Sequence, residues 1–144
     1  MKSKEWMLIY NIVGAAMEVY NVLGRGLSEA IYQEALKHEF LMRHIHFLKE
    51  EPIHAYYKGI LLDKVYIPDF ICDNIIVELK ATEEISSDHR AQLFNYLRIA
   101  KKKLGILVNF GERNLHAERY LYSYEEDNFI LLTTENYKYY IDED

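Results

Sequence analysis

The feature that most constrains this chain is an apolar stretch from residue 67 to residue 80, interrupted near its middle by Asp73-Asn74. Asp and Asn tolerate positive φ angles, so this dipeptide suits the tight turn of a β-hairpin. The flanking segments then pair as antiparallel strands, with Phe70 opposite Val77. The stretch therefore predicts a buried hairpin near the centre of a β-sheet.

Continuing that register places Asp69 opposite Glu78. Directly opposed residues on one face of a sheet have Cβ atoms about 5 Å apart. Facing carboxylates repel and half-buried charges are costly, so this register requires a divalent cation, a shared proton or a paired base. Lys80 lies two residues beyond Glu78 and points to the same face. The charges alone predict either a cation site or a cross-strand salt-bridge cluster of structural value only.

Composition indicates one globular domain over residues 1–144, with 50% hydrophobic and 28% charged residues. We expect no membrane partner, because no apolar run approaches the roughly 20 residues that span a bilayer and no signal peptide is evident. The single cysteine, Cys72, excludes an internal disulfide and favours a reducing, cytoplasmic location. The net charge of −6 argues against a broad basic surface but allows a local basic groove.

Hydrophobic spacing and capping signals predict helices followed by strands, with one further helix between two strands. The expected helices cover about 6–23, 28–43 and 86–100, and the expected strands about 45–50, 53–61, 65–72, 75–81, 104–110, 117–124 and 128–134. A turn at 62–65 would separate the second and third strands. This order predicts an α+β fold with a mixed central β-sheet flanked by helices, in which strands 75–81 and 104–110 are parallel neighbours.

Two predicted helices carry polar side chains that could face the hairpin. Glu29 falls in the first turn of its helix, where a carboxylate interacts favourably with the helix dipole. His89, Gln92 and Tyr96 share one face of the helix after the hairpin. Each of these residues also has an ordinary structural explanation. Glu29 could be a first-turn helix acid, and Gln92 and Tyr96 could belong to a polar helix face. For Tyr32, on the same helix as Glu29, core packing is the expected role.

Five motifs in order connect these residues to a known family. They are G-x-x-E-x-x-Y at 26–32, Tyr-Lys-Gly at 57–59, Pro68-Asp69 with the V-E-L-K-A run at 77–81, the helix segment 89–97, and the strand 104–111. In this order and spacing the chain resembles the bacterial GxxExxY family, a branch of the PD-(D/E)XK nuclease superfamily. The resemblance covers about residues 8–111 and assigns no role to the C-terminal strands and acidic, tyrosine-rich tail at 112–144.

The resemblance implies a restriction-endonuclease-like core with its site on the central hairpin. It implies catalytic roles for Glu29, Asp69, Glu78 and Lys80, and substrate binding by Gln92 and Tyr96. Mg²⁺ (or Mn²⁺) would be held by Asp69, Glu78, the backbone carbonyl of Leu79 and Glu29.

The expected activity is metal-dependent hydrolysis of phosphodiester bonds in DNA or RNA, with nucleic acid as the partner. The alternative is a catalytically silent nuclease fold that binds nucleic acid or protein. Self-association as a homodimer is expected by analogy with other small nucleases only.

Overall fold

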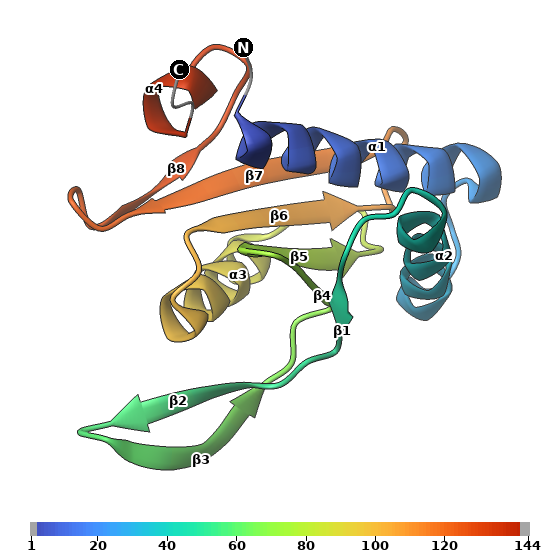
Figure 1. The fold of residues 1–144 in the computed structure, drawn as a ribbon. Coiled ribbons are helices and arrows are strands. Elements are labelled where there is room, and N and C mark those ends of the chain that lie inside the picture. The colour runs from blue at the N-terminus through green and yellow to red at the C-terminus, as the bar shows by residue number, and fades with distance from the viewer. Residues whose placement is uncertain (1–2, 142–144) are drawn as a thin grey trace.

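A six-stranded mixed β-sheet forms the centre of the protein, and the computed structural model describes residues 3–141 around it (Figure 1). Across the sheet the strands are β1 (Leu48–Lys49), β4 (Phe70–Cys72), β5 (Ile75–Lys80), β6 (Leu104–Asn109), β7 (His116–Ser123) and β8 (Asn128–Leu131). The helices are α1 (Lys4–Leu23), α2 (Glu29–Met42), α3 (Ser87–Ala100) and the short α4 (Tyr137–Tyr140). The predicted α+β, restriction-endonuclease-like class is confirmed.

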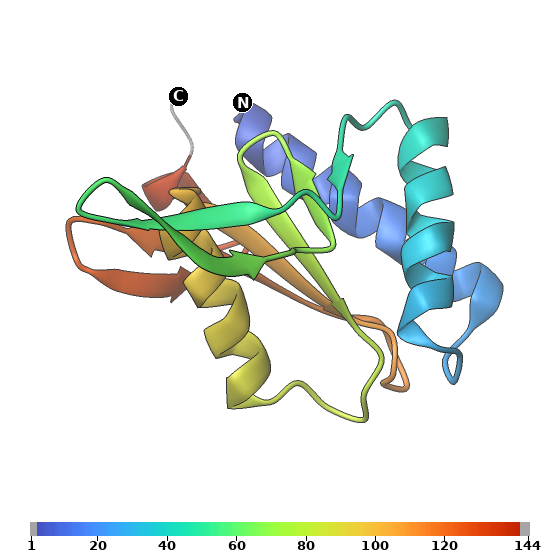
Figure 2. The same ribbon diagram turned by 90° about the horizontal axis from the view of Figure 1, so that it is seen from below.

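Helices cover both faces of this sheet. α1 and α2 pack on one face and α3 on the other, as Figures 1 and 2 show from two sides. Successive residues of β5 therefore enter different cores. Ile75, Val77 and Leu79 join the α1–α2 core, and Ile76 joins the α3 core. Glu78 shares the parity of Ile76, so the predicted acid faces the α3 side.

The central hairpin has the predicted register. Asp73, at the turn, has a φ of 54°, and Phe70 pairs with Val77. β5 and β6 are parallel neighbours, as the intervening helix α3 led us to expect. Asp73 thus supplies the positive φ angle for which an Asp-Asn turn is suited.

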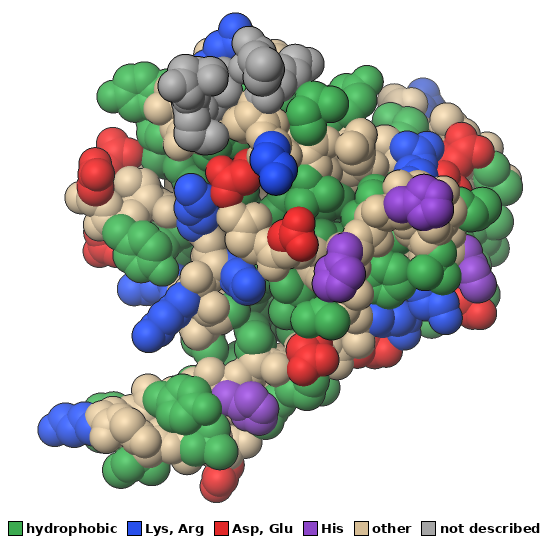
Figure 3. Space-filling model, in the orientation of Figure 1, with side chains coloured by type: hydrophobic (Ala, Val, Ile, Leu, Met, Phe, Trp, Pro, Cys, Tyr) green, Lys and Arg blue, Asp and Glu red, His purple; other side chains and the backbone are tan. Residues whose placement is uncertain are grey.

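The turn predicted at residues 62–65 is wrong, because β3 (Ile60–Tyr66) runs through it without interruption. The chain reverses earlier, at Lys58-Gly59, where φ is 49° and 78°. Positive φ at both central residues matches the twist of a two-residue hairpin loop, and glycine accepts it without steric cost. β2 (Ile53–Tyr57) and β3 consequently form a separate two-stranded sheet, called the arm below, which extends from the main body (Figure 3).

α1 departs from the expectation that no segment could span a membrane. Within residues 3–141 it is the one helix long and apolar enough to cross a bilayer by length and composition, with a mean hydropathy of 1.2. In this structure its inner residues, among them Ile9, Ile12 and Val19, are buried in the main core. α1 thus serves here as a core helix.

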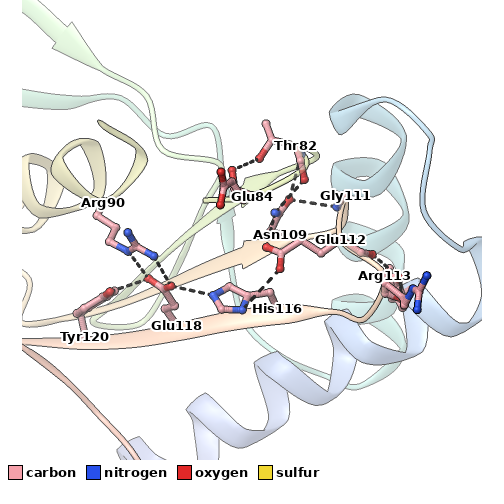
Figure 4. A network of polar contacts seen from close by, with 11 residues as sticks. Thr82, Glu84, Arg90, Asn109, Gly111, Glu112, Arg113, His116, Glu118 and Tyr120 are labelled. Atoms are coloured by element: carbon pink, nitrogen blue, oxygen red, sulfur yellow. Dashed lines mark hydrogen bonds and ion pairs between the residues drawn. The ribbon is translucent and has the colours of Figure 1, made fainter. Parts of the chain in front are cut away.

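A buried asparagine clamps the ends of β5 and β6 (Figure 4). Asn109 Oδ1 accepts bonds from the amides of Thr82 (3.0 Å) and Gly111 (3.1 Å). Its Nδ2 donates to the Thr82 carbonyl (3.0 Å) and to Glu112 Oε2 (2.7 Å). The side chain is fully buried, and these four bonds satisfy a buried polar group. The chain leaving Lys80 is thereby fixed against the chain leaving β6.

The clamp predicts opposite effects for two Gly→Ala substitutions. A Cβ at Gly111 would lie 2.2 Å from the Thr82 carbonyl oxygen, so we expect Gly111→Ala to lower the free energy of unfolding by about 1–3 kcal/mol. A Cβ at Gly14, inside α1, would meet only the flexible tip of Arg43 at 3.2 Å. Gly14→Ala should be neutral or stabilise by up to about 1 kcal/mol. Urea unfolding measures both, and equal effects would contradict the clamp.

Candidate active site

The two acids of the hairpin bind to each other's backbone. The Asp69 amide donates to Glu78 Oε1 at 2.6 Å, and the Leu79 amide donates to Asp69 Oδ2 at 2.8 Å. These two bonds lie just beyond the β4–β5 backbone pairing, which ends at Phe70 and Val77. The carboxylates are therefore neighbours, as the register predicted, but each is held by an N–H group of the opposing segment.

Two residues that sequence analysis did not assign to the site support Asp69. Gln33 of α2 donates from Nε2 to Asp69 Oδ1 at 2.9 Å, and the Glu50 amide donates to the Asp69 carbonyl at 3.1 Å. Gln33 follows Glu29 by one helical turn, a spacing that could have indicated its role. Glu50 gave no comparable signal, because only the fold brings it beside Asp69.

Glu29 lies at the edge of this cluster. It is exposed in the first turn of α2 and lines a pocket of about 330 Å³ with Ala30, Gln33, Glu50 and Asp69. The structure thus brings Glu29 to the same pocket as Asp69. Within the described residues, no hydrogen bond joins the Glu29 side chain to another group.

Tyr32, the tyrosine of the G-x-x-E-x-x-Y motif, is a core residue, as its structural interpretation predicted. Its hydroxyl donates to the Gly24 carbonyl at 2.5 Å and accepts from the Leu27 amide at 3.2 Å. Its ring stacks on Phe110 with the centroids 4.4 Å apart. Tyr32 therefore fixes the loop that leads into Glu29, which gives the motif a structural explanation.

Burial and like charges disfavour the ionised forms of both acids. Burial is the main cause that raises the pKa of Asp69, opposed by its bond from the Leu79 amide. Burial also raises the pKa of Glu78, and the neighbouring Asp69 charge adds to the rise. The charge of Glu29 raises both pKa values, whereas Lys80 lowers them. The acids outnumber the single base, so a proton or a cation is needed to balance the charge.

The donor atoms present suit a hard divalent cation. Glu78 is 5% exposed, yet within residues 3–141 no hydrogen bond engages its Oε2. The Lys80 carbonyl accepts from the Phe110 amide on the β6 side. Because strand residues alternate between edges, the Leu79 carbonyl points to the opposite edge, toward Asp69. Two carboxylates and one carbonyl therefore lie along the same edge of β5, and Mg²⁺ commonly uses one or two carboxylates with water.

A larger ligand set is absent from the described part of the chain. Among residues 3–141, no group of three or more His, Cys, Asp or Glu side chains is arranged to hold a metal ion. Direct ligation by Glu29 as a third carboxylate therefore has no support from the geometry, and a contact through water stays a prediction.

α3 presents its polar face to Lys80 and the acids. Lys80 Nζ donates to Gln92 Oε1 at 3.2 Å. Tyr96 is 5% exposed, and burial followed by the charges of Glu78 and Asp69 raises its pKa to about 12. Gln92 is exposed, whereas Tyr96 is buried with its ring against that of Tyr66. His89 caps α3 through a reciprocal pair of bonds with Ser86.

A separate ion pair joins α3 to β7 (Figure 4). Arg90 binds both carboxylate oxygens of Glu118 at 2.8 Å, while His116 and Tyr120 contact the same carboxylate at 2.8 and 2.6 Å. The bond from Arg90 is the main cause that lowers the pKa of Glu118 to about 2. This carboxylate is satisfied by its partners, in contrast to that of Glu78.

Comparisons with known proteins identify a family for most of the chain. Residues 7–120 match the PD-(D/E)XK nuclease superfamily. No curated protein matches the chain significantly. A solved structure described as "Crystal structure of SSO0001" is similar at 20% identity and a TM-score of 0.48, covering 62% of this chain and 48% of that chain. The present chain thus spans about half of the length of that structure.

The raised pKa values predict how stability depends on pH in metal-free buffer. Folded Glu78 keeps a proton that the unfolded chain releases above its ordinary pKa of 4.5. Its contribution is therefore present in acid and is lost as the pH rises toward the raised pKa. We expect Glu78→Gln, which keeps an acceptor for the Asp69 amide, to weaken the loss of stability between about pH 5 and pH 8. Urea unfolding across this range measures the slope, and an unchanged slope would contradict the assignment.

Glu118→Gln should behave in the opposite sense. The pKa of Glu118 is lowered to about 2, so its contribution is present above 4.5 and is lost as the pH falls toward 2. The substitution should cost about 2 kcal/mol at pH 7 and make the loss of stability in acid shallower. The same unfolding series, extended to acid, checks this prediction and serves as the control for Glu78→Gln.

Proposed function

Because the chain belongs to the PD-(D/E)XK nuclease superfamily, we propose that it is a divalent-metal-dependent nuclease of the GxxExxY branch. Its reaction would be hydrolysis of phosphodiester bonds in DNA or RNA. The observation that carries the proposal is the buried pair Asp69 and Glu78, with an unengaged Glu78 oxygen and Lys80 on the same strand. A scaffold with no cation to bind has no physical need for two adjacent buried carboxylates.

In this proposal Asp69, Glu78 and the Leu79 carbonyl hold Mg²⁺ or Mn²⁺, and Glu29 acts through water. The bound ion would polarise the scissile phosphate and acidify a coordinated water. Gln33 fixes one oxygen of Asp69, and the Leu79 amide fixes the other. The first acid is therefore oriented before any substrate arrives.

Lys80 is the proposed general base or charge-stabilising group. Its ammonium follows Glu78 on the same face and is held by Gln92. From there it would orient or deprotonate the attacking water, or stabilise the charge that develops on the phosphate. Gln92, which is exposed, would contact the nucleic-acid backbone, and Tyr96 would support Glu78.

Replacement of Lys80 tests the chemistry. We expect Lys80→Ala to reduce metal-dependent cleavage by about 10²–10⁴-fold, the usual contribution of a positioned proton-transfer group. Labelled single- and double-stranded DNA and RNA would serve as substrates, with Lys138→Ala, an exposed lysine of α4, as the matched control. Full cleavage by Lys80→Ala would contradict the proposed role.

Metal binding can be tested without turnover. An ion that binds only the folded state stabilises it by mass action, by about 2.7 kcal/mol at one hundred times its Kd. We expect Mn²⁺ or Mg²⁺ to raise the melting temperature of the wild type, but not that of Asp69→Asn or Glu78→Gln. Glu118→Gln should retain the shift. A metal-dependent shift without cleavage of any nucleic acid would favour the silent binding module over the enzyme.

A further inference from the structure

The outer side of α1 carries a hollow that the proposed nuclease site does not use. Its lining residues recur at each helical turn from residue 6 to residue 21, which is about 22 Å of α-helix. We call this hollow the α1 groove, and the argument concerns six of its lining residues: Trp6, Ile9, Val13 and Gly14 of α1, Arg43 at the end of α2, and Arg119 of β7. Its volume of about 510 Å³ is within the range of small-molecule pockets.

The floor of the α1 groove is mainly apolar. Trp6 and Ile9 are buried, and Val13 is half-buried one turn further along the helix. Gly14 adds no side chain, and a Cβ placed there would lie 3.2 Å from Arg43 Nη1. The glycine therefore allows the Arg43 guanidinium to lie directly against α1.

The two guanidiniums of the groove differ in their partners. Arg43 Nε donates to Glu39 Oε2 at 2.7 Å. Arg119 is half-buried, and within residues 3–141 no hydrogen bond or ion pair engages its guanidinium. Burial lowers the pKa of Arg119, which is the direction expected for a charge removed from water without compensation. Such a charge is costly unless an anion pairs with it.

Arg90 shows how this chain satisfies a comparable guanidinium. It binds both carboxylate oxygens of Glu118 at 2.8 Å. This fork-to-fork geometry is the one that a guanidinium forms best with a carboxylate. Glu18 also lines the α1 groove, but no ion pair joins it to either arginine among the described residues. Arg119 therefore has the same capacity as Arg90 and lacks the acid.

We propose that the α1 groove binds a small organic anion, a carboxylate with an apolar body. Its carboxylate would pair with Arg119, and its apolar body would lie on the floor formed by Trp6, Ile9 and Val13. A nucleic acid fits this groove poorly, because surfaces that bind nucleic acid are polar and strongly positive. The groove instead has a mainly apolar floor, and two carboxylates, those of Glu18 and Glu39, lie on or beside it.

The ligand of the α1 groove would be distinct from the nuclease substrate. α1 packs on one face of the sheet, whereas Glu78 faces the α3 side. The sheet and α1 therefore separate the groove from the candidate active site. The inference uses none of the acids of that site and stands whether or not the chain is a nuclease.

Octanoate, with octanamide as an uncharged probe of the same chain length, tests the inference. We expect calorimetry to give a Kd of about 1 mM or lower for octanoate, and amide NMR shifts to map it to α1 and β7. Arg119→Gln should weaken octanoate binding at least about tenfold, through loss of a charge-assisted pair, and leave octanamide binding unchanged. Arg98→Gln, at an exposed arginine of α3, is the matched control and should bind octanoate like the wild type. Glu78→Gln should also retain octanoate binding.

Four results would overturn the inference. They are a wild type that binds no octanoate, equal weakening by Arg119→Gln and Arg98→Gln, amide shifts confined to other elements, and displacement of octanoate by an oligonucleotide. The last would assign the groove to nucleic acid. If Arg119→Gln does not fold, Arg119→Lys keeps the charge but loses the bidentate geometry, so it should still weaken octanoate binding. Octanoate binding by Arg119→Lys equal to that of the wild type would then contradict the assignment.

Discussion

Reciprocal hydrogen bonds between the two segments of the central hairpin hold the candidate site together. The Asp69 amide binds Glu78, and the Leu79 amide binds Asp69, so each carboxylate is fixed by the segment that carries the other. These two bonds from backbone amides to side chains take the place of backbone–backbone hydrogen bonds beyond the end of β4. They keep two acids close together in a buried position despite their repulsion. The positions of Lys80, Gln92 and Gln33 matter chemically because this pair is fixed.

The surrounding structure limits the freedom of that pair and of Lys80. The four bonds of Asn109 fix the chain just after Lys80, and the Ser86–His89 cap fixes the start of α3, which carries Gln92. On the other side, Tyr32 holds the loop before Glu29. Each contact removes conformational freedom before substrate arrives, which lowers the entropy that binding must offset.

The hairpin and its register could be predicted from sequence because both follow from local rules. Turn chemistry located Asp73, and a side-chain period of two then placed Asp69, Glu78 and Lys80. The reversal at Lys58-Gly59 was misplaced because Asp63 and Lys64 look like turn residues, although they tolerate an exposed strand. Gln33 and Glu50 could not be assigned because tertiary packing alone brings them to Asp69. The C-terminal strands were placed, but the pairing of β7 with β6 and of β8 with β7 came only from the fold.

The closed base of the arm has an evolutionary consequence. The chain leaves the sheet after β1 and returns at Asp69, and the two ends are already bonded to each other. An excursion of this kind behaves as an insertion, since its length and surface can change while the strands on either side keep their pairing. Natural variation could thus remodel the surface of the arm, while Asp69 and the acids beside it stay unaltered. The arm and the chemistry of the central hairpin would be free to diverge separately.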